Sequence, residues 1–309
     1  MNAKLQNVPQ AFNCVQPTGS ILTIDRTGHV FPAGGHFQGV QHVSGDPDRM
    51  LLTSSSNREA YLVACRMQPS AGRNGVVERV TTLRASPLNH AGGFQADGQL
   101  LAIGVEDDSA RNRSEVQFWK YPPGGSPSLI RAIVRSGPGD VSTAGAVGFA
   151  PHAGGMVLVV GTWDCNTVDV YTSARNPLAD PAAAFRLWRT WRKADADKQG
   201  WCDNNFGNYQ AINLLKQSDG EIFMVGFNRS DGDDWMDLYS LNMSAASPTT
   251  RMLRKVAKKH MICHGSCSFD KAAGLQTIST TRFEVYAAKG TSGDHATGTT
   301  ITLNRFRAD

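Results

Sequence analysis

Short apolar runs separated by turn residues follow one another along the whole chain. Residues 60–67 and 99–105, for example, are rich in aliphatic side chains. Runs of this length and composition are typical of β-strands. The dipeptides Asp97-Gly98 and Asp219-Gly220 separate pairs of runs as tight hairpin turns do. The pattern predicts an all-β fold made of many short strands.

A motif of histidine, glycine and glutamine recurs between these runs. It reads GGHFQGVQ at residues 34–41 and HAGGFQ at residues 90–95. Looser echoes of it occupy residues 142–147, 205–210 and 271–276. The regular return of such a motif indicates a repeat architecture, in which each copy opens one structural unit.

The predicted strands group behind the five copies of the motif. The first unit holds residues 39–41, 50–53, 60–67 and 76–83; the second 93–96, 99–105, 115–121 and 128–134; the third 145–150, 155–162, 167–172 and 185–191; the fourth 209–216, 221–227, 235–241 and 249–256; and the fifth 274–279, 282–289 and 299–306. The last unit is one strand short. Residues 20–25 precede the first motif and supply the missing strand from the other end of the chain.

This organisation resembles the five-bladed β-propellers, in which four-stranded sheets surround a central channel. The resemblance is one of architecture and covers the chain from about Thr18 onward. It implies a single propeller domain at residues 18–309 behind an N-terminal extension at residues 1–17. It also implies that the N-terminal strand completes the last blade, which removes an exposed sheet edge. A six-bladed alternative stays open if residues 13–16 and 174–206 contain further strands.

Composition limits the partners of the protein. The formal net charge is +4 and the basic residues are dispersed, so we expect no nucleic-acid partner. No window is long and apolar enough for a membrane span. The first residues lack the apolar run of a signal peptide. The compartment therefore stays open between the cytosol and, if an export signal has been removed, a secreted or periplasmic location. We expect a monomer.

In a propeller, the leads into the inner strands and the loops between second and third strands emerge on one face. A concave mouth with converging polar groups is the default place for a ligand. We expect a small polar ligand or a glycan to bind there, with five residues as contacts: His36, His90, Trp163, Trp201 and Asn205. Tryptophan faces stack well on sugar rings, although each loop could instead pack its tryptophan against its own blade.

A metal or a catalytic acid is also conceivable at this mouth. His36 and His90 hold equivalent motif positions, and with His264 they could supply the three protein ligands of a divalent metal. The alternative is that the histidines bind neighbouring backbone, so the cofactor stays unknown. Asp140 and Asp203 are candidates for the acid or base of a glycosidase-like or metal-assisted hydrolase. Non-catalytic recognition is the primary hypothesis, and whether the protein is an enzyme stays open.

Three further patterns predict structural roles. Glutamines recur beyond the motif glycine at Gln41, Gln95, Gln210 and Gln276, where they could line the channel or tie one blade to the next. Two cysteine pairs could form disulfides, Cys165 with Cys202 and Cys263 with Cys267. The basic run at residues 254–259 is expected on an outer strand, where lysines protect a sheet edge from pairing with another chain.

Overall fold

The computed structural model describes residues 4–43, 48–70, 72–176, 180, 182–289 and 298–309. Strands make up 58% of the described residues and helices 7%, so the predicted all-β class is confirmed. The α-helix α1 (Val8–Cys14) precedes the first strand. Short 3-10 helices occur at η1 (Gly139–Ser142), η2 (Trp163–Cys165), η3 (Lys193–Asp195) and η4 (Thr249–Arg251). In these ranges no helix has the length and apolar character needed to cross a membrane.

Most strands pair with their neighbours in sequence, as antiparallel units of four. The first unit contains β2 (Phe37–Val43), β3 (Arg49–Ser54), β4 (Glu59–Ser70) and β5 (Arg73–Ala85). The second contains β6 (His90–Asp97), β7 (Leu100–Glu106), β8 (Arg113–Lys120) and β9 (Ser128–Ser136). The third contains β10 (Ala146–His152), β11 (Gly155–Gly161), β12 (Thr167–Ser173) and β13 (Arg186–Arg192). The fourth contains β14 (Ala211–Lys216), β15 (Ile222–Ser230), β16 (Asp233–Leu241) and β17 (Leu253–Met261).

The fifth unit combines both ends of the chain. Its C-terminal strands are β18 (Cys267–Thr277), β19 (Phe283–Lys289) and β20 (Thr300–Phe306). The fourth strand is β1 (Ser20–Asp25), which pairs antiparallel with β20 from Ser20 opposite Arg305 to Asp25 opposite Thr300. The predicted pairing of the N-terminal strand with the last strand of the chain is therefore confirmed.

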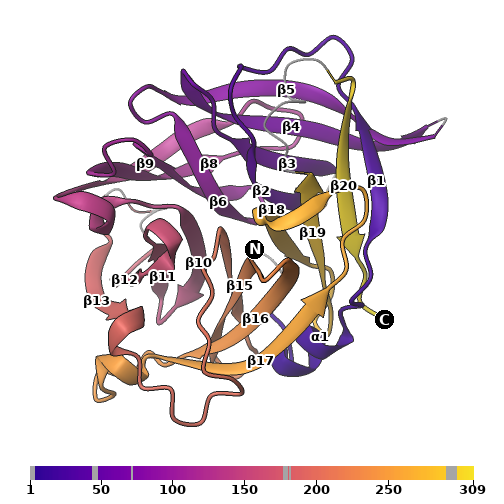
Figure 1. Ribbon diagram of the computed structural model, residues 1–309. Coiled ribbons are helices and arrows are strands. Elements are labelled where there is room, and N and C mark those ends of the chain that lie inside the picture. The colour runs from indigo at the N-terminus through magenta and orange to yellow at the C-terminus, as the bar shows by residue number, and fades with distance from the viewer. Residues whose placement is uncertain (1–3, 44–47, 71, 177–179, 181, 290–297) are drawn as a thin grey trace.

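The first strands of the units meet at the centre of the molecule (Figure 1). Each of β2, β6, β10, β14 and β18 contacts the next, and β18 contacts β2. Parallel bridges join Ala273 to Gly39 and Ala146 to Gly93. A second parallel contact, between β1 and β5, makes the hydrogen-bonded order of the first and fifth units a closed barrel of eight strands.

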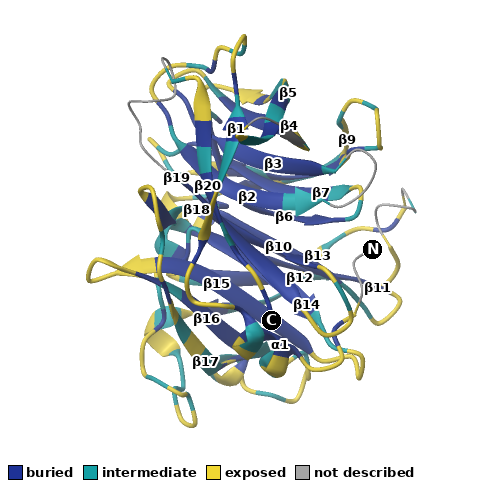
Figure 2. Ribbon diagram, turned by 90° about the vertical axis from the view of Figure 1, so that its right-hand side faces the viewer, coloured by how far each residue is buried: buried dark blue, intermediate teal, exposed yellow. Residues whose placement is uncertain are grey.

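The apolar core follows the same circular order. Each of its clusters packs one unit against the next: Phe94 and Leu62 join the first two units, and Phe149 and Phe118 the second and third. In Figure 2 the central strands are buried, and the exposed residues are concentrated in the loops. The segment before Thr18 joins this core, because Val8 and Phe12 of α1 pack with Phe227 and Phe306.

Glycine permits the close approach of the central strands. A Cβ atom on Gly93 would lie 2.3 Å from the carbonyl oxygen of Gln210. Of the recurring glutamines, Gln41 and Gln95 tie these strands together, as one of the two alternatives predicted. The Gln95 Oε1 atom accepts hydrogen bonds from the backbone N–H groups of Phe149 (2.9 Å) and Leu214 (2.8 Å).

The regions of the six-bladed alternative add no further sheet. Residues 13–16 lie at the end of α1, and the described part of residues 174–206 contains only β13 and η3.

Candidate functional site

A cleft of about 410 Å³ opens on the face where the central strands begin. Because neighbouring central strands run parallel, the residues that lead into them lie on one face, which we call the mouth face. One wall of the cleft is the lead into β14, from Asn205 to Asn208. The other wall is the β15–β16 hairpin, whose turn residues Asp231 and Gly232 both have positive φ. An Asp-Gly turn of this kind is the usual way to close a tight hairpin.

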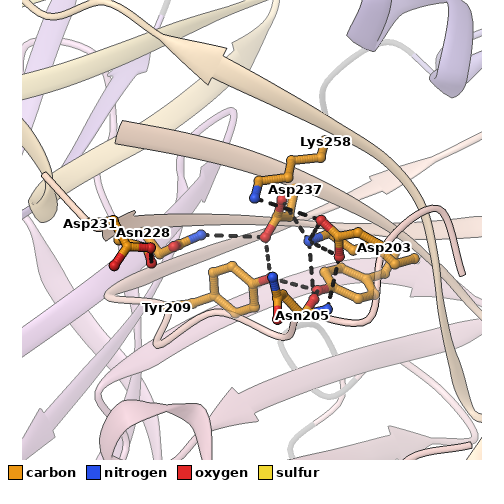
Figure 3. Close-up of polar contacts among 10 residues, drawn as sticks. Asp203, Asn205, Tyr209, Asn228, Asp231, Asp237 and Lys258 are labelled. Carbon is orange, nitrogen blue, oxygen red and sulfur yellow. Dashed lines mark hydrogen bonds and ion pairs between the residues drawn. The ribbon is translucent and has the colours of Figure 1, made fainter. Parts of the chain in front are cut away.

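The floor of the cleft is a buried lysine, Lys255, between the carboxylates of Asp203 and Asp237. Figure 3 labels both carboxylates together with Tyr209 and Asn228. The Lys255 side chain is 1% exposed, and its Nζ lies 2.9 Å from Asp203 Oδ1 and 3.0 Å from Asp237 Oδ1. It also donates to the backbone oxygen of Asn205 at 3.1 Å. A buried ammonium group is stable only with such partners, because burial removes its hydration.

Two tyrosines and an asparagine complete this network around Asp237. The Tyr209 hydroxyl donates to Asp237 Oδ2 at 2.6 Å and lies 2.6 Å from the Tyr239 hydroxyl. The Asn228 Nδ2 donates to the same Asp237 oxygen at 3.4 Å. Burial raises the pKa of Tyr209 and of Tyr239 well above the usual value, so both remain neutral phenols. Both Asp237 oxygens therefore have partners within the protein.

The two carboxylates of the floor have opposite pKa shifts. Burial raises the pKa of Asp237, and the attraction of Lys255 offsets this only in part. Burial also acts to raise the pKa of Asp203, but hydrogen bonds from Lys255 and Asn205 outweigh it, and the net shift is downward. Pairs of acids whose environments separate their pKa values are found at catalytic sites.

The rim of the cleft is polar and carries charges of both signs. Lys258 Nζ lies 3.8 Å from the centroid of the half-buried Trp235 ring and 3.6 Å from Asp203 Oδ2. Lys193 Nζ donates to Asn208 Oδ1 at 2.9 Å. The side chains of Asn205 and Asn208 are exposed. The cleft thus offers amide groups, ammonium groups and one aromatic ring to a ligand.

A second polar cluster, which we call the His90 cluster, occupies the mouth face at the start of β6. The Gln38 Nε2 atom lies 2.6 Å from His36 Nε2 and 2.7 Å from His90 Nε2. His90 Nδ1 lies 3.1 Å from Glu106 Oε1. The His90 ring is 6.0 Å from that of Trp163, over which the Arg111 guanidinium lies at 3.7 Å.

The residues predicted as functional divide between these two places. Asp203 and Asn205 belong to the cleft. Asp140, at 3.7 Å from Arg111, lies with Trp163 and the two histidines in the His90 cluster. The structure therefore does not place the two predicted catalytic aspartates in one site.

Trp201 does not line the cleft and is not part of the His90 cluster. Its ring stacks on Trp191 with a centroid distance of 6.4 Å and packs edge-on against Tyr239 at 5.5 Å. It lines a separate hollow together with Arg251 and Arg254. Packing between the third and fourth units accounts for its position.

The predicted triad of metal-binding histidines is not formed. His36 and His90 converge on Gln38, whereas His264 lies in the turn between Cys263 and Cys267, where its backbone pairs with Asn304. Across the described residues, no group of three or more His, Cys, Asp or Glu side chains is placed to hold a metal ion.

One of the two predicted disulfides is confirmed. Cys263 is bonded to Cys267, whereas Cys165 and Cys202 are both free thiols. The second pairing was wrong because Cys165 points into the core, where its Sγ donates to the backbone oxygen of Tyr209 at 3.3 Å. Burial raises the pKa of Cys165 to about 12, so this thiol is unreactive. Cys202 is exposed.

Sequence reasoning missed Tyr209, Asp237, Lys255 and Lys258. A single aspartate within the apolar run 235–241 was the available signal for Asp237, since a carboxylate inside a strand needs a partner. Lys255 and Lys258 belong to the basic run that was expected to protect a sheet edge. That expectation is wrong for Lys255, which is buried. It is also wrong for Lys259, whose Nζ donates to the backbone oxygens of Phe12, Asn13 and Val15 around the end of α1.

No family model matches the sequence, and no curated protein matches it. Among solved structures, it is similar to a bifunctional GH43-CE protein of Bacteroides eggerthii, with 10% identity over 87% of this chain and a TM-score of 0.44. The chain spans 33% of that protein. It is also similar to the PQQ-bound aldose sugar dehydrogenase of Streptomyces coelicolor, with 12% identity over 94% of this chain and 99% of that one, and a TM-score of 0.39. A third similar structure is the β-propeller domain of Nup133 from Vanderwaltozyma polyspora, with 8% identity over 88% of this chain and 71% of that one, and a TM-score of 0.34.

Proposed function

We propose that this protein is a non-catalytic recognition protein that binds a polar ligand, a carbohydrate, in the cleft above Asp237. The observation that carries the proposal is the buried Lys255 network, which fixes the floor of an open polar cleft. Lys255 holds the backbone oxygen of Asn205, and the side-chain amide of Asn228 donates to Asp237. A site whose polar groups are held in place before binding loses little conformational entropy when the ligand arrives.

We further propose that the five units are the blades of a five-bladed propeller. The domain comprises residues 18–309, with the preceding segment packed onto it. The closed circle of contacts between central strands supports this reading. The cleft then lies on the mouth face, where propeller loops offer side chains to a ligand. We expect the protein to act as a monomer, which light scattering on the purified chain tests.

The charge of the cleft favours a neutral ligand rich in hydroxyl groups. Lys193 and Lys258 are opposed by Asp203 and Asp231, so no single sign dominates the rim. Amide groups such as those of Asn205 and Asn208 both donate and accept hydrogen bonds, which suits sugar hydroxyls. Trp235 supplies the apolar surface that one sugar face would cover.

The same geometry argues against chemistry at Asp237. A general acid must come within hydrogen-bond reach of the substrate. Asp237 is 2% exposed, and its oxygens already contact Lys255, Tyr209 and Asn228. We therefore assign Asp237 to holding the site in shape.

A glycan array followed by calorimetry on the best hit tests the proposal. Asn205→Ala and Trp235→Ala are expected to weaken binding at least tenfold, with no turnover of the bound sugar. Trp163→Ala is the matched control, because it removes a mouth-face tryptophan outside the cleft, and Trp201→Ala is a second control. Both should bind like the wild type. Binding that survives Asn205→Ala and Trp235→Ala, or that is lost in Trp163→Ala, would contradict the proposed site.

The accessibility of Asp203 favours one second candidate, a glycosidase-like hydrolase in the same cleft. In that case Asp203, whose side chain is 27% exposed and whose pKa is lowered, is the base. Chromogenic glycosides assayed with the wild type, Asp203→Asn and Asp140→Asn test it. Turnover abolished only by Asp203→Asn would support hydrolysis in the cleft, and absence of turnover would support recognition alone.

A further inference from the structure

A cavity of about 240 Å³ lies where the central strands end, on the face opposite the mouth face. Four of the five central strands line it: β6 with residues 95–97, β10 with 149–151, β14 with 214–216, and β18 with Leu275 and Thr277. Leu5 closes one side, because its N–H donates to the Lys216 oxygen at 3.2 Å and its own oxygen accepts from the Ser218 N–H at 2.8 Å. The space is therefore bounded by four strand ends and the N-terminal segment.

Hydrogen-bonded amides cross between the central strands beside this cavity. Asn213 Oδ1 accepts from Gln41 Nε2 and from the backbone N–H of Leu275, both at 3.1 Å. Gln95 Nε2 donates to the backbone oxygen of Leu214 at 3.0 Å. Among the described residues, the cavity and the Asp237 cleft share no lining residue. The cavity is therefore a separate place, and nothing proposed for it depends on the function proposed for the cleft.

Most of the cavity wall is apolar. Six of its residues are no more than 5% exposed: Leu5, Ala96, Phe149, Leu214, Leu215 and Leu275. Apolar cavities are poorly hydrated, and one of about 150 Å³ lined by Leu, Ile and Phe binds benzene. By that measure this cavity has room for one six-membered ring with a short side chain, or for a hydrocarbon chain of similar volume.

Two ammonium groups belong to the edge of this apolar space. Lys216 Nζ donates one hydrogen bond, to the backbone oxygen of Pro151 at 2.9 Å, and an ammonium group has three N–H donors. Burial lowers the pKa of Lys216, and the charge of Lys4 lowers it further. An anion beside both groups would oppose these two effects. Within the described residues neither lysine belongs to an ion pair.

The net charge of the wall favours an anionic ligand. Its described residues contain one carboxylate, that of Asp97, which is 8% exposed and has a partner of its own. Two ammonium groups and one carboxylate leave an excess of one positive charge. A ligand with a single negative charge balances it, whereas a cationic ligand would add to it.

We propose that this cavity binds a small carboxylate whose hydrocarbon part has about the volume of one substituted ring. The hydrocarbon part fills the apolar space between the strand ends, and the carboxylate accepts hydrogen bonds from Lys216 and Lys4. Hydrogen bonds between charged groups are stronger than those between neutral ones, so an acid should bind better than its amide. Aromatic acids and medium-chain fatty acids share this chemistry, and the experiment distinguishes them.

Calorimetric titration of the full chain with 3-phenylpropanoate and with octanoate tests the site, each acid being compared with its primary amide. We expect one molecule per chain and the negative heat-capacity change that burial of apolar surface gives. The better of the two acids should bind about tenfold more tightly than its amide. Tighter binding of 3-phenylpropanoate would identify aromatic acids, and tighter binding of octanoate would identify fatty acids. Absence of saturable binding by both acids, or equal binding of acid and amide, would overturn the proposal.

Two lysine variants test the polar end of the site. Lys216→Met removes the ammonium group and keeps most of the side-chain volume. It should remove most of the preference for the acid and leave binding of the amide unchanged, a pattern that loss of folding would not produce. Lys4→Met alters an exposed residue and should reduce the preference in the same direction. An unchanged preference in both variants would contradict the assignment.

Lys271→Met is the matched control, because Lys271 lies on β18 but does not line the cavity. It should bind the acid like the wild type, and an equal loss of acid binding in this variant would refute the location. Glycan binding by the wild type should be the same with and without saturating acid. Failure of the cavity proposal is thus distinct from failure of the function proposed for the cleft.

Discussion

At the scale of single residues, Lys255 and Asp237 depend on each other. Neither side chain is more than 3% exposed, and their charged atoms are 3.0 Å apart. Removing one member of a buried pair leaves the other charge without compensation, which costs more than the pair contributes. Such a pair is therefore a sensitive reporter of the integrity of the cleft floor.

We predict that Asp237→Asn lowers the free energy of unfolding by about 3–5 kcal/mol, because the Lys255 ammonium stays buried with a neutral neighbour. Asp203→Asn is the matched control. The Asp203 side chain is 27% exposed, so its loss is expected to be smaller, about 1 kcal/mol. Urea unfolding of the three proteins measures both values. Equal losses of unfolding free energy in the two variants would contradict the larger contribution assigned to the buried Asp237.

The lowered pKa of Asp203 also predicts that the free energy of unfolding depends on pH. Its pKa is lowered in the folded state from the ordinary value of 3.8. A group of this kind contributes stability that is present above its ordinary pKa and is lost as the pH falls through the lowered value. The difference in unfolding free energy between wild type and Asp203→Asn should be constant from pH 5 to 7 and should shrink below about pH 4. Urea unfolding at several pH values measures it, and a difference that is as large at pH 3 as at pH 7 would contradict the assignment.

At the scale of elements, the close contact between β6 and β14 depends on a missing side chain. We predict that Gly93→Ala destabilises the fold by about 1–3 kcal/mol, because its Cβ would meet backbone atoms at 2.3 Å and 2.6 Å. Gly145→Ala is the control. Its added Cβ would find its nearest atom, Glu106 Oε1, at 3.6 Å, which is an ordinary contact. Thermal and urea unfolding should rank the two variants in that order, and the reverse order would refute the role given to Gly93.

The sequence predicted elements better than it predicted the site. The runs at residues 20–25 and 299–306 carry a local strand pattern, and the incomplete last unit required a partner, so the pairing of β1 with β20 could be inferred. Asp203 and Asn205 could be inferred because they lie in a polar lead into a strand. Lys255 could not, since its role depends on contacts with Asp203 and Asp237, each on a different segment. For the same reason spacing alone could not separate His264 from His36 and His90.

At the scale of the whole molecule, the fold is held closed where its two ends meet. Thr23 lies opposite Thr302 in the register of β1 and β20. We predict that Thr23→Cys with Thr302→Cys forms a disulfide on oxidation. Because it closes a loop of nearly the whole chain, it should raise the free energy of unfolding by up to about 5 kcal/mol.

A control with Thr23→Cys and Arg305→Cys shifts the second cysteine along β20, away from Thr23. It should not crosslink under the same conditions. Gel electrophoresis measures this, because reduction should change the mobility of the matched pair only. Crosslinking of the control at an equal rate would mean that the two ends are not held in the register described.

The central claim is that a polar ligand binds in the cleft whose floor contains Lys255 and Asp237. A crystal structure with the best glycan from the array tests it most directly. We expect density for a sugar between Asn205, Asn228 and Trp235, with the Lys255 contacts unchanged. Sugar density confined to the His90 cluster, to the hollow beside Trp201 or to the opposite face of the molecule would contradict the account.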